Sequence, residues 1–284
     1  MMESIRWAFN TRLWAPNKGD WMTALSLIQP EEKERISKFV FRKDAKSSIA
    51  GRLMLRKFAS EVLGLPWSDV KFGRTDKGRP FLVNSLPENP DVDFNVSHQG
   101  SWAVLAANCG GSKIGVDVME LEYSGGKNIP EFFHTMRRQF TSEEWSHIYS
   151  FPTESTQLAS FYRHWCLKEG VVKALGVGIG FELQRVSFQL TTQELSTNMI
   201  TLDTQVKIDG ILDNRWQFEE TLLDPSHSVA VARQFDSPQS NTSTAGALRF
   251  IQMSFDDLIA SGDQLTKPDE AAAEEFISKE ETPW

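Results

Sequence analysis

Residues 93–119, DFNVSHQGSWAVLAANCGGSKIGVDVM, contain three apolar segments separated by two turns. Residues 93–97 and 102–107 flank the short sequence HQGS, a pattern that is typical of a β-hairpin. Gly110 and Gly111 then interrupt the pattern, and residues 114–119 predict another strand. We therefore place the joint between two halves of the chain close to this pair of glycines.

Helical and strand-like periodicities occur on both sides of that joint. The mixture of helices with hairpin-type strands favours an α+β fold over a doubly wound parallel sheet. We expect two similar α/β lobes, at residues 1–113 and 114–235, followed by an acidic appendage at 236–284 that begins with the linker-like sequence DSPQSNTSTAG. The expected strands are 3–9, 80–83, 181–190, 204–209, 215–219 and 228–233, and the expected helices are 21–28 (with Asp20 as N-cap), one starting at Pro30, 43–63, 130–149 and 156–175.

The net charge of −8 over 284 residues argues against a nucleic-acid-binding protein. The charge is unevenly distributed: +5 in residues 1–113, −6 in 114–235 and −7 in 236–284. This division is compatible with an anionic ligand on one side of a site and a metal on the other, and equally with ordinary uneven surface charge. Two cysteines, no secretory signal and no long apolar run lead us to expect a cytosolic protein without disulfides or membrane spans.

The segment 157–180, QLASFYRHWCLKEGVVKALGVGIG, has the period of a helix. Glu169 and Lys173 are four residues apart and lie on one face of that helix, with Trp165 one turn earlier. Taken alone, an ordinary surface ion pair is the simpler explanation. The three glycines at 176, 178 and 180 follow the helix, which is the wrong order for a dinucleotide-binding turn.

The strand 114–119 combines an apolar face with one acidic residue. Ile114, Val116 and Val118 share one face, and Gly115, Asp117 and Met119 share the other. Asp117 is a candidate metal ligand; the alternative is an edge strand with its aspartate in solvent.

Two further segments, at 74–80 and 95–100, contain residues that suit anion binding. RTDKGRP has three cations and a glycine, which favour phosphate capture, although a solvated charged loop is also common. NVSHQG places a histidine at the hairpin turn, where a purely structural role is the alternative.

These four pieces, in this order, resemble the two-lobed 4′-phosphopantetheinyl transferases, and in particular the animal members of that family. The family pattern is a Gly-Ile/Val-Asp strand followed by Trp/Phe-x-x-Lys-Glu-x-x-x-Lys on a helix, and it matches residues 115–117 and 165–173. The segments at 30–57 and 129–145 carry the closer animal-type likeness, and the resemblance spans about residues 3–235.

The resemblance implies a fold of two pseudo-duplicated lobes with the active site between them, and transfer of the phosphopantetheine arm of coenzyme A to a carrier-protein serine with release of adenosine 3′,5′-bisphosphate. It implies that Asp117 and Glu169 hold Mg²⁺ and that Lys173 contacts the pyrophosphate. Glu169, directly or through a metal-held water, is the candidate base for the serine. The coenzyme A contacts that it implies are Arg35, Arg74, Thr75, Asp76, Lys77, Gly78, Arg79, Asn95, Val96, Ser97, His98 and Lys168.

The chain departs from the bacterial pattern, which has a third acid in the strand. Met119 occupies that position and is a poor ligand for Mg²⁺. Glu120 would face the opposite way unless the strand bulges, so we expect water or Gln99 to complete the site. A second departure, Gly170 in the helix, removes no ligand.

The expected partners are acyl carrier domains of fatty acid synthase, of aminoadipate-reductase-type enzymes and of mitochondrial type, contacted by a monomer. A docking patch would be basic or apolar; Phe132, Phe133, Arg137 and Arg138 are candidates, although an ordinary amphipathic helix explains them as well. Two other functions stay open at this point: a non-catalytic coenzyme A or carrier-protein binding module, and an unrelated Mg²⁺ phosphohydrolase.

Overall fold

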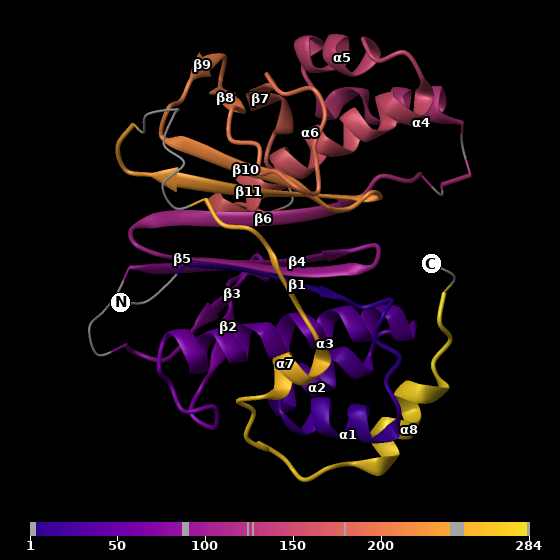
Figure 1. The fold of residues 1–284 in the computed structure, drawn as a ribbon, viewed down its shortest axis with the longest axis vertical. Coiled ribbons are helices and arrows are strands. Elements are labelled where there is room, and N and C mark those ends of the chain that lie inside the picture. The colour runs from indigo at the N-terminus through magenta and orange to yellow at the C-terminus, as the bar shows by residue number, and fades with distance from the viewer. Residues whose placement is uncertain are drawn as a thin grey trace.

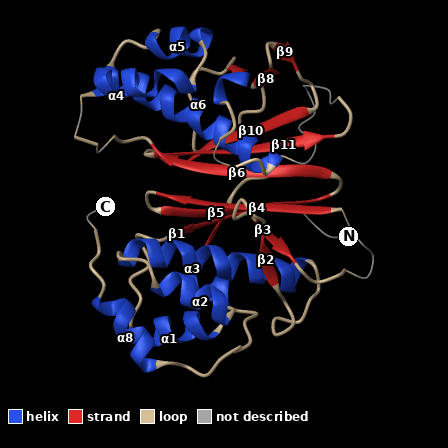
Figure 2. Ribbon diagram, turned by 180° about the vertical axis from the view of Figure 1, so that it is seen from behind, coloured by secondary structure: helices blue, strands red, loops and turns tan. Residues whose placement is uncertain are grey.

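Two lobes, each a sheet with helices on its outer side, meet through their strands (Figures 1 and 2). The computed structural model describes residues 4–86, 91–123, 125–126, 128–178, 180–238 and 247–282. The α+β architecture with two lobes is confirmed. Of the helices in these ranges, none has the length and apolar character needed to cross a membrane.

The N-terminal lobe is built on a four-stranded sheet in the order β12-β1-β5-β4. The predicted hairpin is present as β4 (Val92–Gln99) and β5 (Trp102–Cys109), and β5 also pairs with β1 (Ile5–Asn10). The helix α3 lies against this sheet and is buried along most of its length. The other elements of this lobe are α1 (Lys18–Ser26), α2 (Pro30–Ser37), α3 (Arg42–Lys57), a π-helical turn (Phe58–Val62), β2 (Phe72–Arg74) and β3 (Pro80–Leu82).

The first helix starts earlier than the sequence predicted, because Asn17 rather than Asp20 is its N-cap. The Asn17 side chain accepts from Asp20 N–H at 3.0 Å, and the Asp20 carboxylate accepts from Asn17 N–H at 2.9 Å. Asp20 therefore closes a reciprocal capping box from the third helical position.

The C-terminal lobe is built on a three-stranded antiparallel sheet in the order β10-β11-β6. Its long helix α6 (Glu154–Leu175) packs on β6 (Ser112–Glu120) and β11 (His227–Phe235). The remaining elements are α4 (Ile129–Met136), α5 (Ser142–Tyr149), β7 (Val186–Gln189), β8 (Gln205–Ile208), β9 (Ile211–Leu212) and β10 (Trp216–Asp224).

Two predicted elements of this lobe are shorter than expected. The single helix expected at 130–149 is divided by a 3₁₀ turn (Arg137–Gln139), after which Thr141 caps α5 through a capping box with Glu144. The strand expected at 181–190 is only β7, because a second 3₁₀ turn (Leu183–Arg185) precedes it.

Gly115 allows α6 to lie directly on β6. A Cβ atom at this position would come within 2.0 Å of the carbonyl oxygen of Gly170 and 2.5 Å of the backbone nitrogen of Ala174. Both contacts are with the backbone of α6, so a side chain could not be accommodated by a rotamer change. The glycine thus fixes the distance between the strand that carries Asp117 and the helix that carries Glu169 and Lys173.

The two sheets are joined by an apolar layer and by polar side chains of β4. Val104, Val116 and Val231 are fully buried in the cluster between the sheets. Beside it, side chains at alternate positions of β4 accept hydrogen bonds from the edge of β6, which has no strand partner on that side. The donors and acceptors are Ile114 N–H and Asp93 Oδ2 (2.7 Å), Val116 N–H and Asn95 Oδ1 (3.0 Å), and Glu120 N–H and Gln99 Oε1.

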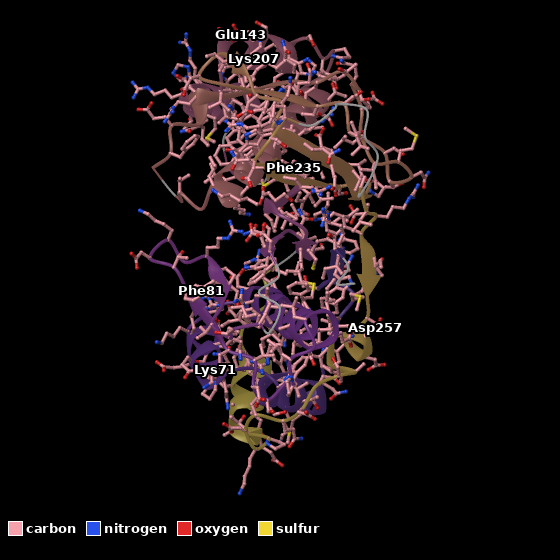
Figure 3. All side chains as sticks on the ribbon, turned by 90° about the vertical axis from the view of Figure 1, so that its left-hand side faces the viewer. Lys71, Phe81, Glu143, Lys207, Phe235 and Asp257 are labelled. Carbon is pink, nitrogen blue, oxygen red and sulfur yellow. The ribbon has the colours of Figure 1, made fainter. Side chains whose placement is uncertain are left out.

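The C-terminal segment returns from the second lobe to the first. β12 (Ile251–Met253) extends the first sheet parallel to β1, and α7 (Phe255–Ile259) and α8 (Glu270–Ser278) pack on the N-terminal helices. Asp257 of α7 lies well below Phe235, the last residue of β11, in Figure 3. Phe276 stacks on Trp21 with the ring centroids 4.9 Å apart. The described part of the segment expected to be an appendage is therefore packed into the N-terminal lobe; residues 239–246 of its linker lie outside the described residues.

Candidate active site

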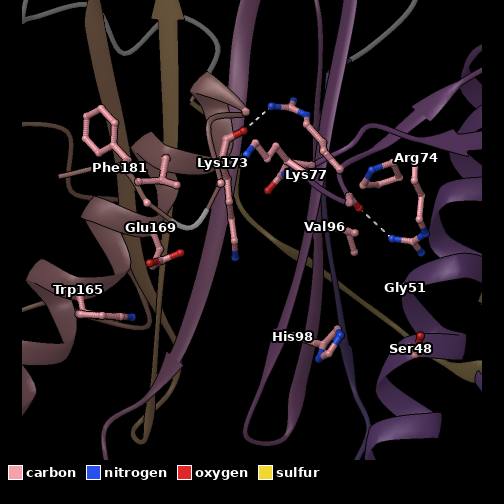
Figure 4. A pocket seen from close by; sticks show the side chains of 18 of the residues that line it. Ser48, Gly51, Arg74, Lys77, Val96, His98, Trp165, Glu169, Lys173 and Phe181 are labelled. Carbon is pink, nitrogen blue, oxygen red and sulfur yellow. Dashed lines mark hydrogen bonds between the residues drawn. The ribbon is translucent and has the colours of Figure 1, made fainter. Parts of the chain in front are cut away.

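A cleft of about 940 Å³ lies between the lobes, and its walls come from both (Figure 4). On one side, α6 presents Glu169 and Lys173; on the other are the turn before β3, strand β4 and helix α3. The predicted site residues that line it are Arg35, Arg74, Lys77, Gly78, Arg79, Asn95, Val96, His98, Glu169 and Lys173.

Asp117, Ser97 and Lys173 form a closed triangle of hydrogen bonds at the junction of β4, β6 and α6. Lys173 Nζ donates to Asp117 Oδ1 at 2.6 Å and to Ser97 Oγ at 2.8 Å, and Ser97 Oγ donates to the same Oδ1 at 2.8 Å. Asp117 is 5% exposed, which excludes the alternative of an aspartate in solvent. Its second oxygen, Oδ2, is buried and has no hydrogen-bond partner in the part of the chain that the structure describes.

Glu169 is the second carboxylate of the site and lies on the same face of α6 as Lys173. Burial raises the pKa of Glu169, and the negative charge of Asp117 raises it further, whereas Lys173 lowers it. Two carboxylates that repel each other, one with a buried unpaired oxygen, create a place where a cation is electrostatically favoured.

The position of the missing third acid shows no compensation by a strand bulge. β6 pairs with β11 in continuous register from Ser112 to Glu120. Glu120 Oε1 lies 3.8 Å from His227 Nε2, and the Gln99 side chain accepts from the backbone of Glu120. Within the described residues there is no group of three or more His, Cys, Asp or Glu that could hold a metal ion.

Three arginines on the N-terminal wall surround one carboxylate, that of Glu32. Arg74 Nη2 lies 2.9 Å and Arg35 Nε 3.0 Å from the oxygens of Glu32, and Arg52 Nη1 lies at 3.5 Å. All three arginines line the cleft. The sequence pointed to Arg35 and Arg74, but not to Glu32 or Arg52; Arg52 sits in an otherwise unremarkable helix and shows no local signal.

The turn 74–79 is closed by its own hydrogen bonds and brings Lys77 to the other lobe. Gly78 N–H donates to Thr75 O at 2.8 Å, and Gly78 adopts φ +80°, a conformation that favours glycine. Asp76 is exposed at the tip of this turn. A Cβ at Gly178 would lie 3.2 Å from Lys77 Cδ, so the lysine passes across the glycine-containing loop after α6.

His98 faces the cleft from β4 (Figure 4). The imidazole of His98 is exposed within the cleft. Desolvation by the facing walls, and then the positive charges of Lys173 and Arg52, lower its pKa, so the neutral form with one N–H donor prevails at pH 7.

Arg79 connects the two lobes through contacts with protein groups. Its guanidinium donates to both carboxylate oxygens of Asp93 (2.7 and 2.8 Å), to Ile114 O (3.0 Å) and to the carbonyls of Lys173 and Ala174 at the C-terminus of α6. These bonds give Arg79 a bridging role in this structure, in addition to its place in the cleft wall.

Lys168 does not face the cleft, in contrast to the coenzyme A contact implied for it. Its side chain has no exposed surface; Nζ lies 2.9 Å from Glu144 Oε2 and donates to the carbonyls of Leu183 and Val186. Adjacent helical residues differ by about 100° in direction. When Glu169 faces the cleft, Lys168 must point elsewhere, and it anchors α5 and the segment before β7 instead.

Comparison with known proteins matches both lobes. The family model described as 4′-phosphopantetheinyl transferase, N-terminal, matches residues 12–110, and that of the 4′-phosphopantetheinyl transferase superfamily matches residues 113–232. The human L-aminoadipate-semialdehyde dehydrogenase-phosphopantetheinyl transferase is 44% identical over 290 residues, covering 99% of this chain and 94% of the human protein.

More distant relatives show the same relationship. A phosphopantetheinyl transferase of a Thraustochytrium species is 36% identical over 80% of this chain and 77% of its own length. The 4′-phosphopantetheinyl transferase Sfp of Bacillus subtilis is 29% identical over 58% of this chain and 68% of its own length.

Fold and site together define a two-lobed transferase with a carboxylate pair on one wall and cations on the other. The chain belongs to the 4′-phosphopantetheinyl transferase superfamily and is an enzyme of that family. Members of the family modify carrier proteins and typically use Mg²⁺ and coenzyme A.

Proposed function

We propose that this chain transfers the phosphopantetheine arm of coenzyme A to a carrier serine in the cleft between its lobes, with Mg²⁺ held by Asp117 and Glu169. The observation that carries the proposal is the unpartnered, buried Oδ2 of Asp117 beside Glu169, opposite a wall of arginines. Hard carboxylate oxygens are the protein ligands that Mg²⁺ prefers, and one or two of them suffice. When bound, the ion offsets the charge of the pyrophosphate and stabilises the leaving phosphate oxygen.

Glu169 accepts the proton of the attacking serine. The serine oxygen forms a bond to the β-phosphorus, the bond from that phosphorus to the bridging oxygen breaks, and adenosine 3′,5′-bisphosphate leaves. Glu169 lines the cleft, so its carboxylate is placed to take this proton directly or through a water molecule.

Lys173 and the N-terminal wall bind the phosphates. Lys173 is held in position by Ser97 and Asp117 and places its ammonium beside the carboxylates, where charge on the pyrophosphate must be balanced. Arg35, Arg74, Lys77 and His98 supply donors on the opposite wall, toward the 3′-phosphate. Thr75, Asp76, Gly78, Asn95 and Val96 shape the turn and the strand that carry these groups.

Carrier proteins are the proposed second substrate, and the aminoadipate-reductase type has support from the names of the animal relatives. A second cavity, of about 790 Å³, is lined by His134, Arg137 and Arg138 near α4. Phe133 also lines this cavity, but it is 1% exposed and packs in the cluster under α4, so it contributes little accessible surface to a docking patch. Fatty-acid-synthase and mitochondrial-type carriers, the monomeric state and the cytosolic location remain predictions.

Transfer of labelled pantetheine from coenzyme A to an apo fatty-acid-synthase carrier and an apo aminoadipate-reductase-type carrier, with and without Mg²⁺, tests the proposal. Asp117→Asn and Glu169→Gln should each abolish transfer while the melting temperature stays within a few degrees of wild type. Binding of coenzyme A without transfer to any carrier would contradict the proposal and support a non-catalytic module. Release of phosphate without a carrier would indicate a phosphohydrolase.

A further inference from the structure

Glu32 is a carboxylate in contact with three arginines of the N-terminal wall of the cleft, and its placement needs an explanation. It lies in α2 and is 8% exposed. A negative charge at this position repels a phosphate. If the arginines of this wall bind a phosphate, the Glu32 carboxylate can help only indirectly, through the arginines that it contacts.

The contacts of Glu32 tie together three separate segments of the N-terminal lobe. Arg74 comes from β2 and contacts both oxygens: Nη2 lies 2.9 Å from Oε1 and 3.1 Å from Oε2, and Nε donates to Oε1 at 3.2 Å. Arg35 comes from α2 and donates from Nε to Oε2 at 3.0 Å, while its Nη2 donates to Ser48 Oγ of α3. Arg52, also of α3, completes the group at 3.5 Å.

Arg52 is the member of this group that has donors to spare. Its Nε and Nη1 are buried and make no hydrogen bond to the described residues. Nη1 has only the 3.5 Å ion pair with Glu32, and the side chain lines the cleft. Burial lowers the pKa of Arg52 to about 10, and Glu32 opposes that effect, so the guanidinium is charged at pH 7. An unsatisfied buried guanidinium is costly, and an oxyanion at this point would satisfy it.

The charges of the group favour a dianion. Three guanidinium groups around one carboxylate leave two positive charges in excess, which matches the charge of a phosphomonoester at neutral pH. Mutual repulsion of three arginines would otherwise turn the flexible side chains apart. The pKa of Glu32 is lowered, because the three arginines outweigh the effect of burial, which alone would raise it.

We propose that Glu32 is a positioning residue that holds Arg35, Arg52 and Arg74 as one receptor for a terminal phosphomonoester, and that this receptor selects coenzyme A over its 3′-dephospho form. The inference rests on the proposed function, in which coenzyme A occupies this cleft. Arg52 is assigned as a direct phosphate ligand beside Arg35 and Arg74. In the competing role, Glu32 only reduces the positive charge of the site. The two roles predict opposite changes of KM for coenzyme A when the carboxylate is removed.

Steady-state transfer kinetics with coenzyme A and with 3′-dephospho-coenzyme A separate these roles. Glu32→Gln keeps the size of the side chain and removes its charge. If Glu32 positions the arginines, KM for coenzyme A rises about tenfold, kcat is unchanged, and both constants for the dephospho form are unchanged. A lower KM for coenzyme A would show charge attenuation and overturn the proposal.

The matched control is Glu34→Gln on the same helix, where the Glu34 side chain is 74% exposed and, among the described residues, forms an ion pair with Lys38 alone. It should leave both substrates unaffected. A Glu32→Gln protein that loses activity with both substrates alike would show a purely structural role and overturn the proposal. If Glu32→Gln does not fold, Arg74→Gln, at a side chain that is 31% exposed, should lower the preference for coenzyme A by a similar factor, and an unchanged preference overturns the proposal.

Calorimetric titration of the wild type and Glu32→Gln with coenzyme A and 3′-dephospho-coenzyme A, without a carrier, keeps the two hypotheses distinguishable. If the wild type transfers nothing but binds coenzyme A more tightly than the dephospho form, and Glu32→Gln loses that difference, the proposed function fails and the role of Glu32 stands. If the wild type binds both forms equally, the receptor does not exist.

Discussion

Gly115→Ala should push helix α6 away from strand β6. The added methyl group would lie 2.0 Å from Gly170 O, and α6 must withdraw by about 1 Å for that contact to reach 3.0 Å. Because α6 carries Glu169 and Lys173 and β6 carries Asp117, the shift separates groups that have to act together. We expect an overpacking cost of about 1–3 kcal/mol in unfolding free energy. A misplacement of about 1 Å is sufficient for a loss of about 100-fold in kcat.

Urea unfolding and the carrier-labelling assay, performed on the same preparations, measure both effects. Gly170→Ala is the matched control, because it adds the same methyl group to the facing helix, where the nearest atom is Ala232 Cβ at 3.4 Å, an ordinary van der Waals contact. It should gain about 1 kcal/mol from helix propensity and keep its kcat. A Gly115→Ala protein with wild-type stability and wild-type kcat would refute the view that this contact sets the spacing.

Three further predictions concern buried polar groups. Burial lowers the pKa of His164 to about 3 from 6.5 in the unfolded chain, so the unfolded chain binds this proton first. His164 should therefore contribute a loss of unfolding free energy of about 1.4 kcal/mol per pH unit below 6.5, and His164→Gln should reduce the pH dependence of the unfolding free energy, measured in urea between pH 7 and 5, by that amount. Lys168→Met should lower the unfolding free energy by about 3–5 kcal/mol, because it removes the ion-pair partner of Glu144. KM for coenzyme A should stay unchanged, and a raised KM would show that Lys168 contacts coenzyme A. Arg79→Gln should cost about 1–3 kcal/mol because Asp93, whose pKa burial already raises, loses its partner; an unchanged urea midpoint would contradict the bridging role.

Short-range patterns predicted the central strands and the faces on which Asp117 and Glu169 lie, whereas the role of these two residues as a carboxylate pair came only from the resemblance to the family. Period-two alternation put Asp117 on the face opposite Val116, and the four-residue spacing put Glu169 and Lys173 on one helical face. The same helical geometry argues against Lys168 as a neighbour of Glu169 in the cleft. The coenzyme A contact of Lys168 was implied by the resemblance and has no support from the helical spacing.

Contacts between distant segments had no local signal. Glu32 meets Arg52 and Arg74 only because α2, α3 and β2 pack together, and a charge in an exposed-looking helix reads as a solvated residue. The net charge of +5 in residues 1–113 overstates the positive charge that a ligand can meet. Glu281 of the C-terminal segment lies within ion-pair distance of Arg42 and Lys46 and balances part of that charge.

Strand β4 both joins the two lobes and carries side chains of the site. Asp93 and Asn95 accept from the backbone of β6, and Ser97, two residues further on, reaches Asp117 on the same strand. Val96 and His98, which alternate with them, line the cleft on the side proposed for the nucleotide. A register shift of one residue would exchange these two sets, so the edge contacts that hold the lobes together also fix which side chains face the substrate and which orient the carboxylate.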